Sequence, residues 1–154
     1  MNIVIVGDGK VGAALTQQLS KEGHDITVID NNAEVLTNSM ELYDIMAVQG
    51  NGASLTVQKE ANVGSSDLVI AATSADEINL LCCILAKKLG APHTIARVRN
   101  PEYAEQLIFL KEELGLSMSV NPELAAASEI FRLLQFPSFI QRETFAKGRV
   151  EIVE

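Results

Sequence analysis

Three glycines near the start of the chain have the spacing of a phosphate-binding turn. Gly7, Gly9 and Gly12 follow the apolar, β-branched run of residues 3–6, which predicts a buried parallel strand. Gly7 allows a tight turn, Gly9 lets a pyrophosphate approach the backbone, and Gly12 lets a helix lie close to the strand. The N–H groups at the start of that helix would then face the anion.

An acid at the end of the next predicted strand extends this pattern. Residues 25–30 form that strand, and Asp30 follows the glycines by about the 20 residues at which an acid meets the adenosine ribose in dinucleotide sites. An acid there favours a free 2′-hydroxyl, and therefore NAD(H), ATP or ADP over NADP. The alternative is that Asp30 only caps the next helix, for which Asn31 is the expected N-cap residue.

Polar residues follow the third and fourth predicted strands, where ligands of such sheets bind. Asn51 lies in the loop of residues 49–52, which taken alone is better interpreted as an ordinary turn. Thr73 and Ser74 follow the fourth strand, and either hydroxyl could bond a ribose or a phosphate. The alternative is that they only cap the next helix, with Glu77 completing a capping box from Ser74.

Two arginines alternate on one face of the fifth predicted strand. Arg97 and Arg99 flank Val98, and Arg99 at the strand end could reach a phosphate or an acidic partner. The alternative for Arg99 is a surface ion pair, which is the more common role of an arginine at such a position.

Strands and helices alternate along the chain, which predicts a doubly wound α/β fold. We expect a Rossmann-like, parallel sheet of six strands, followed by a C-terminal helix and a short hairpin around residues 147–148. The predicted strands cover residues 3–6, 25–30, 43–48, 67–72, 93–99 and 116–120, and the later helices cover residues 54–62, 76–89, 101–110 and 124–136. The helix of residues 76–89 is apolar on most sides, so we expect a second element to cover it.

The composition fits a soluble globular domain, because 47% of the 154 residues are hydrophobic and 21% are charged. The net charge of −8 argues against a nucleic-acid or anionic-membrane surface. We expect a cytoplasmic protein, since neither a membrane span nor a leader stands out. Cys82 and Cys83 are expected to be reduced core thiols, and no metal site is expected.

The helix that begins near Glu123 carries more apolar surface than packing on a sheet requires. One stripe is widened by further apolar residues, and together they comprise Leu124, Ala126, Ala127, Ile130, Phe131, Leu133 and Leu134. We interpret the excess as a surface for a partner. The alternative is packing against the tail of the chain.

Several stretches together resemble a known family. They are Gly-Asp-Gly-Lys-Val-Gly (7–12), His-Asp-Ile-Thr-Val-Ile-Asp (24–30), Val-Gln-Gly-Asn-Gly (48–52), Ala-Ala-Thr-Ser-Ala-Asp-Glu-Ile-Asn (71–79), Ile-Ala-Arg-Val-Arg-Asn-Pro-Glu-Tyr (95–103), Asn-Pro-Glu (121–123) and Phe-Ala-Lys-Gly-Arg-Val (145–150). The chain is similar to the N-terminal lobe of RCK (KTN) domains, and closely similar to that of the peripheral regulatory subunits of Trk potassium-uptake systems. The combination is far more specific than the glycine motif alone.

The resemblance implies a cytosolic regulator without catalytic activity, docked on a Trk-type potassium transporter at the inner face of the cell membrane. NAD(H), ATP or ADP would bias its conformation and thereby gate transport. The glycine turn would hold the phosphates, Asp30 the ribose, and Arg99 would lie close to the phosphates from the dimer edge. The expected nucleotide-binding residues are Gly7, Asp8, Gly9, Lys10, Val11, Gly12, Asp30, Asn31, Asn51, Thr73, Ser74 and Arg99.

The resemblance also implies a division of the chain. Residues 1–122 would form the nucleotide-binding lobe, residues 123–137 a crossover helix that packs on a second subunit, and residues 138–154 a hairpin and linker toward a C-terminal lobe. The expected assembly is a homodimer or a tetrameric ring of dimers.

Two other classes of function make different demands on the sequence. A short-chain NAD-dependent oxidoreductase would need Tyr-x-x-x-Lys, and neither tyrosine of the chain has a lysine at that spacing. A two-domain dehydrogenase would need a substrate lobe. The remaining class is a structural subunit with a degenerate site, for which Asp8 within the phosphate turn is the argument. We expect the Asp8 side chain to point away from the turn or Lys10 to offset its charge.

Overall fold

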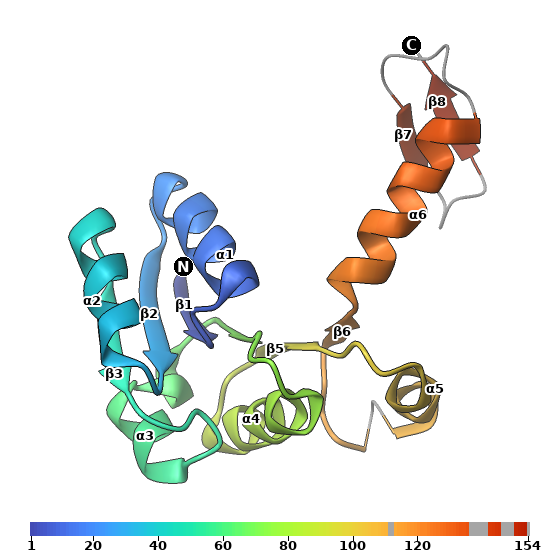
Figure 1. Ribbon diagram of the computed structural model, residues 1–154. Coiled ribbons are helices and arrows are strands. Elements are labelled where there is room, and N and C mark those ends of the chain that lie inside the picture. The colour runs from blue at the N-terminus through green and yellow to red at the C-terminus, as the bar shows by residue number, and fades with distance from the viewer. Residues whose placement is uncertain (111–112, 136–141, 146–149, 154) are drawn as a thin grey trace. The chain divides into compact units, whose positions relative to one another are not determined.

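The computed structural model describes residues 1–110, 113–135, 142–145 and 150–153 (Figure 1). The chain forms two compact units, Met1–Asn121 and Pro122–Glu154. No helix among the described residues has the length and hydropathy that crossing a bilayer requires.

The first unit is built on a parallel sheet of six strands, so the predicted doubly wound fold is confirmed. The strands are β1 (Asn2–Val6), β2 (Asp25–Asp30), β3 (Met46–Gln49), β4 (Leu68–Ala71), β5 (His93–Arg97) and β6 (Met118–Val120). Their order is β3-β2-β1-β4-β5-β6, and every neighbouring pair is parallel. The chain therefore changes winding direction between β1 and β4, the switch point at which such sheets bind ligands.

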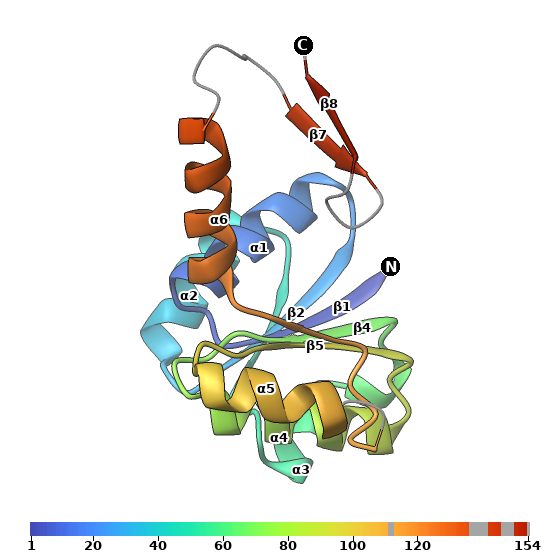
Figure 2. The ribbon, with the colours of Figure 1, turned by 90° about the vertical axis from the view of Figure 1, so that its right-hand side faces the viewer.

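Helices cover both faces of the sheet (Figure 2). On one face lie α1 (Lys10–Lys21) and α2 (Ala33–Leu42), and on the other α3 (Leu55–Glu60), α4 (Asp76–Leu89) and α5 (Pro101–Leu110). A short 3-10 helix, η1 (Val63–Ser65), precedes β4. The bounds of α4 and α5 are those predicted from the sequence.

The core consists of two apolar clusters, one on each face of the sheet. Val4 and Val6 of β1 belong to the cluster under α4, whereas Ile3 and Ile5 belong to the cluster under α1 and α2. All four side chains are at most 3% exposed. A parallel strand covered by helices on both faces must be apolar at successive positions, which explains the continuous run of residues 3–6.

The helix α4 is covered on a second side, as predicted. Tyr103 and Leu107 of α5 belong to the same apolar cluster as Leu80 of α4, and the Tyr103 hydroxyl donates a hydrogen bond to Glu77 Oε1 (2.7 Å). The predicted capping box from Ser74 to Glu77 is wrong, because the N-cap position of α4 is one residue later and Glu77 is bonded to α5.

The helix α2 and the strand β3 differ from the prediction at their ends. The N-cap residue of α2 is Asn32 and not Asn31, since the Asn32 side chain accepts a hydrogen bond from Glu34 N (3.0 Å). At the other end, Tyr43 is still the C-cap residue of α2, so β3 begins at Met46 instead of residue 43.

The strand β5 ends two residues earlier than predicted. The backbone N–H groups of Arg99 and Asn100 each donate to Asp76 Oδ2 (2.8 Å), at the start of α4. These bonds take the segment out of the sheet after Arg97, where the ladder with β6 also ends.

The second unit contains α6 (Pro122–Gln135) and two antiparallel strands, β7 (Arg142–Phe145) and β8 (Val150–Val153). The helix α6 begins one to two residues before the starts given in the sequence analysis, and the predicted pairing of two short strands is observed. The large apolar side chains of α6 that are exposed are Leu124, Ile130, Phe131, Leu133 and Leu134. The predicted helix end at Phe136 and the predicted turn at residues 147–148 lie outside the described residues.

Candidate functional site

A cavity of about 540 Å³ opens at the carboxyl ends of the strands of the first unit. Segments that follow β1, β2, β3 and β4 line it, together with the end of β5. The predicted site residues that line it are Gly7, Gly9, Lys10, Val11, Asp30, Asn31, Asn51, Thr73 and Ser74. The predicted residues that do not line it are Asp8, Gly12 and Arg99.

The glycine turn has the geometry that its spacing predicts. Gly7 has a φ of +93°, and a Cβ there would lie 2.8 Å from the backbone nitrogen of Thr73. A Cβ on Gly12 would lie 1.8 Å from the Gly7 carbonyl oxygen, so Gly12 acts by allowing α1 to approach the turn. Gly9 has no heavy atom within 4 Å of a Cβ position, so its side of the backbone is open.

The start of α1 is directed at this cavity. Gly9 is the N-cap residue without a side-chain cap, Lys10 and Val11 follow in the lining, and the first turn of the helix holds no acid. The positive end of the helix dipole and the Lys10 ammonium group therefore act on the same space. This arrangement favours an anion.

The carboxylate of Asp30 is held in a fixed orientation. Its Oδ2 accepts a hydrogen bond from Asp8 N (2.7 Å) and its Oδ1 accepts one from Asn32 N (2.8 Å). A carboxylate oxygen can accept more than one hydrogen bond, so both oxygens can still accept from hydroxyl groups. Asp30 therefore presents a preorganised acceptor at the edge of the cavity next to the glycine turn.

The side chain of Asp8 does not line the cavity, in agreement with the expectation that it points away from the turn. It is only 4% exposed and accepts a hydrogen bond from the hydroxyl of Ser39 on α2. Burial raises the pKa of Asp8, and the nearby Asp30 charge raises it further, whereas the Ser39 hydrogen bond opposes both. Asp8 thus ties the turn to α2.

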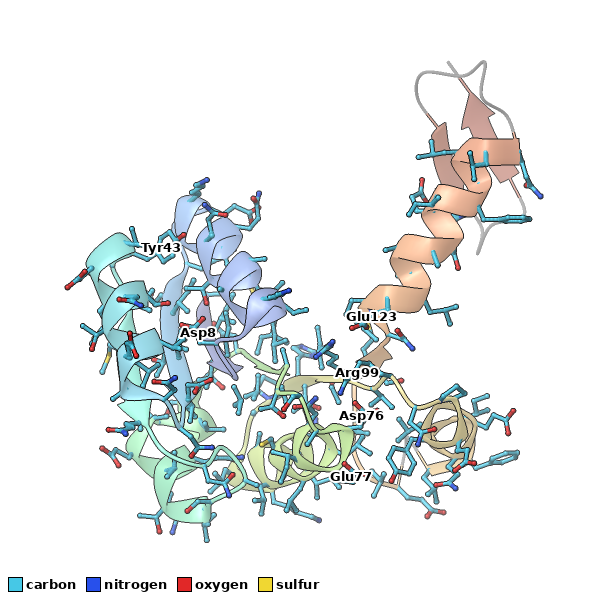
Figure 3. All side chains as sticks on the ribbon, in the orientation of Figure 1. Asp8, Tyr43, Asp76, Glu77, Arg99 and Glu123 are labelled. Carbon is cyan, nitrogen blue, oxygen red and sulfur yellow. The ribbon has the colours of Figure 1, made fainter. Side chains whose placement is uncertain are left out.

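Arg99 forms contacts within the chain instead of lining the cavity. Its Nε lies 3.6 Å from Asp76 Oδ1, beside the start of α4 (Figure 3), and its guanidinium donates to the Ser74 carbonyl oxygen. Of the two interpretations of Arg99 from the sequence, this geometry corresponds to the ion pair. The lining position on β5 belongs to Arg97, two residues earlier, whose Nη1 donates to the Thr73 carbonyl oxygen (3.3 Å).

Sequence reasoning missed some lining residues besides Arg97, namely Gly50, Gly52 and Ile78. Gly50 N donates to the Asp30 carbonyl oxygen (2.9 Å), and a Cβ on Gly52 would lie 2.1 Å from Val6 Cγ1. The loop is therefore packed against the end of β1, which only glycine permits. The signal in the sequence was the pair of glycines around Asn51, which the interpretation as an ordinary turn undervalued.

The wall formed by the ends of β4 and β5 is held by one buried amide. Asn79 Oδ1 accepts from Thr73 N (2.8 Å) and from the Thr73 hydroxyl (2.7 Å). Asn79 Nδ2 donates to the carbonyl oxygens of Thr73 (3.2 Å) and Arg97 (2.9 Å). The Thr73 hydroxyl therefore donates its hydrogen bond to Asn79 and not to a ligand in the cavity.

The two cysteines of the first unit are not activated, and the described residues hold no cluster of metal ligands. Burial raises the pKa of both Cys82 and Cys83 to about 12, so their thiols are not nucleophiles at neutral pH. Among the described residues, no cluster of three or more His, Cys, Asp or Glu side chains could hold a metal ion. The charged groups that line the cavity are Lys10, Arg97 and Asp30.

The sequence matches a known domain family over most of its length. Residues 3–122 match the TrkA-N domain. The chain belongs to the TrkA-N domain family. It is 39% identical over 154 residues to the Trk system potassium uptake protein TrkA homolog of Archaeoglobus fulgidus, and 36% identical over 156 residues to TrkA of Haemophilus influenzae. These alignments cover 100% and 99% of this chain, but the chain spans only about a third of each relative, 35% and 34%.

Solved structures share the fold of this TrkA-N domain. The TrkA-N domain of the inner membrane protein ybaL from Escherichia coli superposes with a TM-score of 0.76 at 21% identity, covering 86% of this chain and 96% of that one. The AMP-bound Kef C-terminal domain of Shewanella denitrificans gives 0.71 at 19% identity, covering 90% and 82%. The GsuK channel bound to NAD gives 0.65 at 23% identity, covering 77% and 21%.

Proposed function

We propose that this TrkA-N domain binds an adenine nucleotide, NAD(H) or ADP or ATP, and that this binding regulates a Trk-type potassium uptake system. The observation that carries the proposal is the cavity at the switch point, where the glycine turn and the oriented carboxylate of Asp30 lie side by side. The TrkA relatives support the link to potassium uptake, and the AMP-bound and NAD-bound neighbours support the class of ligand.

Each half of the ligand has a counterpart in the cavity. The ribose hydroxyls would donate to Asp30, and the phosphates would accept from the N–H groups at the start of α1 and from Lys10. Asn31 and Asn51 would lie beside the adenosine half, since they follow β2 and β3. Residues from the ends of β4 and β5 would meet the part of the ligand beyond the first phosphate.

The regulation we propose is a shift between conformations and involves no catalysis. A ligand can move such an equilibrium only by binding one conformation more tightly than the other. The nucleotide would do so in a homodimer or a tetrameric ring of dimers, held through α6 and docked on the transporter at the cytoplasmic face of the membrane. Nucleotide recovered chemically unchanged after prolonged incubation with the protein would agree with this, and turnover would contradict it.

Calorimetric titration tests the nucleotide site directly. NADH, NAD, ATP, ADP and pyrophosphate are titrated into the chain and into its Asp30→Ala variant. We expect the variant to bind NADH about 10- to 100-fold more weakly, because a charged acceptor of the ribose is lost, and to bind pyrophosphate nearly as before. Equal losses for NADH and pyrophosphate would mean that Asp30 acts through the glycine turn, whose Asp8 N–H it binds, and not at the ribose.

Asp44→Asn is the matched control for this titration, since Asp44 is an exposed acid that does not line the cavity. Its affinities should equal those of the unmodified chain. Absence of binding by all four nucleotides to the unmodified chain would overturn the proposed site.

A further inference from the structure

The side chain of Asn79 is the buried group that links the two strands farthest from Asp30 in the lining. It is fully buried, at 0% exposure. Its amide oxygen accepts hydrogen bonds from Thr73, and its amide nitrogen donates to the carbonyl oxygens of Thr73 and Arg97. Thr73 and Arg97 both line the cavity, whereas Asn79 does not. Asn79 can therefore affect a ligand only through these two neighbours.

The strand order fixes how far this wall lies from the ribose site. Neighbouring strands are about 4.8 Å apart, so the path from β2 through β1 and β4 to β5 separates the ends that carry Asp30 and Arg97 by about 14 Å. The glycine turn lies between them, one strand away from Asp30. A nucleoside monophosphate bound at Asp30 would reach the turn, whereas a second phosphate would continue toward β4 and β5.

We infer that Asn79 is a positioning residue that holds Thr73 and Arg97 against the distal part of the nucleotide, so that the site discriminates adenine nucleotides by their length. This inference rests on the proposed nucleotide binding. Arg97 supplies the charge for the second phosphate, and Asn79 fixes the backbone of Arg97 relative to that of Thr73. A monophosphate does not use this wall, and its affinity is independent of Asn79.

Titration of AMP, ADP and NADH into the Asn79→Ser variant tests the inference. Loss of the amide removes the bonds between the two strand ends, so we expect the Kd values of ADP and NADH to rise about tenfold, while that of AMP changes less than about twofold.

A double-mutant cycle separates positioning from general loosening of the fold. Arg97→Gln should raise the Kd of ADP about tenfold by itself, and in the double variant Asn79→Ser with Arg97→Gln the two losses in ADP affinity should be less than additive. Additive losses would show that Asn79 does not act through Arg97 and would overturn the inference.

Gln58→Met is the matched control, because Gln58 is another fully buried amide but donates to the carbonyl oxygens of Gly52 (2.7 Å) and Cys82 (3.0 Å). We expect this variant to leave the ratio of the AMP and ADP Kd values unchanged. Equal weakening of AMP and ADP in Asn79→Ser would overturn the inference while leaving the proposed function intact. Absence of binding by the unmodified chain would overturn both.

Discussion

Asp8 and Asp30 are neighbouring carboxylates with opposite environments. Asp30 lines the cavity and is oriented by two backbone N–H groups, whereas Asp8 is buried against α2 with one hydrogen bond from Ser39. The other carboxylate oxygen of Asp8, Oδ1, is buried and makes no hydrogen bond. The cost of burying the Asp8 charge is therefore only partly offset, which is why its pKa is raised.

The raised pKa of Asp8 makes the stability of the first unit depend on pH. The folded state holds the Asp8 proton more tightly than the unfolded state, whose pKa is near the ordinary 3.8. Stability is therefore lost as pH rises from about that value through the folded-state pKa. We expect Asp8→Asn to increase the free energy of unfolding in urea at pH 7, and the increase to shrink below pH 4, because the parent carboxyl is then protonated.

The exposed Asp44 offers the same substitution as a control for Asp8→Asn. Asp44→Asn should leave the dependence of unfolding free energy on pH close to that of the unmodified chain. A lower stability of Asp8→Asn at pH 7 would show that the Ser39 hydrogen bond outweighs the burial of the charge.

At the scale of elements, two glycines where the turn meets α1 have different roles, one in stability and the other in ligand binding. A Cβ on Gly12 would overlap the Gly7 carbonyl oxygen, whereas a Cβ on Gly9 would enter open space in the cavity. The two glycines belong to one motif, but only Gly12 is required by the fold.

This difference predicts opposite phenotypes for two alanine variants. Gly12→Ala should lower the free energy of unfolding by about 1–3 kcal/mol, because α1 must move away from the turn. Gly9→Ala should cost less stability, at most about 1 kcal/mol for the poorer N-cap, since its φ of −74° suits alanine, and yet weaken pyrophosphate and NADH binding. Thermal unfolding and calorimetry of both variants check this, and normal nucleotide binding by Gly9→Ala would contradict the predicted approach of the phosphates.

Elements of this fold follow from local sequence, whereas some of their ends depend on distant residues. The bounds of α4 and α5 were predicted correctly, because apolar periodicity, an N-terminal Pro and a following Gly are local signals. The end of β5 was not, because the carboxylate of Asp76 draws away the N–H groups of Arg99 and Asn100. No pattern within residues 93–99 reveals that contact.

The same distant contact explains which arginine lines the cavity. Arg97 and Arg99 share a strand face by their spacing, so sequence alone could not choose between them. The pairing of Arg99 with Asp76 removes it from the lining and leaves Arg97 there. The glycine turn, by contrast, was predictable residue by residue, because its geometry is set by the glycines themselves.

At the scale of the whole molecule, the exposed apolar residues of α6 predict self-association. Phe131 is 62% exposed and Leu134 is 73% exposed, on a helix for which the sequence pattern and the family resemblance both predict a partner surface. We expect a homodimer at micromolar concentration in sedimentation velocity, because burying such side chains against a second copy is favourable.

The substitution Phe131→Glu should shift this dimer toward monomer. Leu42→Glu, at a similarly exposed leucine on α2 (71%), is the control and should leave the sedimentation coefficient unchanged. A monomer of the unmodified chain at that concentration would contradict the predicted role of α6.

The burial of Cys82 and Cys83 has a practical consequence for spectroscopy. With pKa values near 12 instead of the ordinary 9.0, their thiolate fraction at neutral pH is roughly a thousandfold smaller than that of an ordinary cysteine, and both side chains are fully buried. A maleimide dye would therefore label a cysteine introduced at a surface position and leave these two unmodified. Fluorophores could be attached to the two units of the native sequence without first replacing its own thiols.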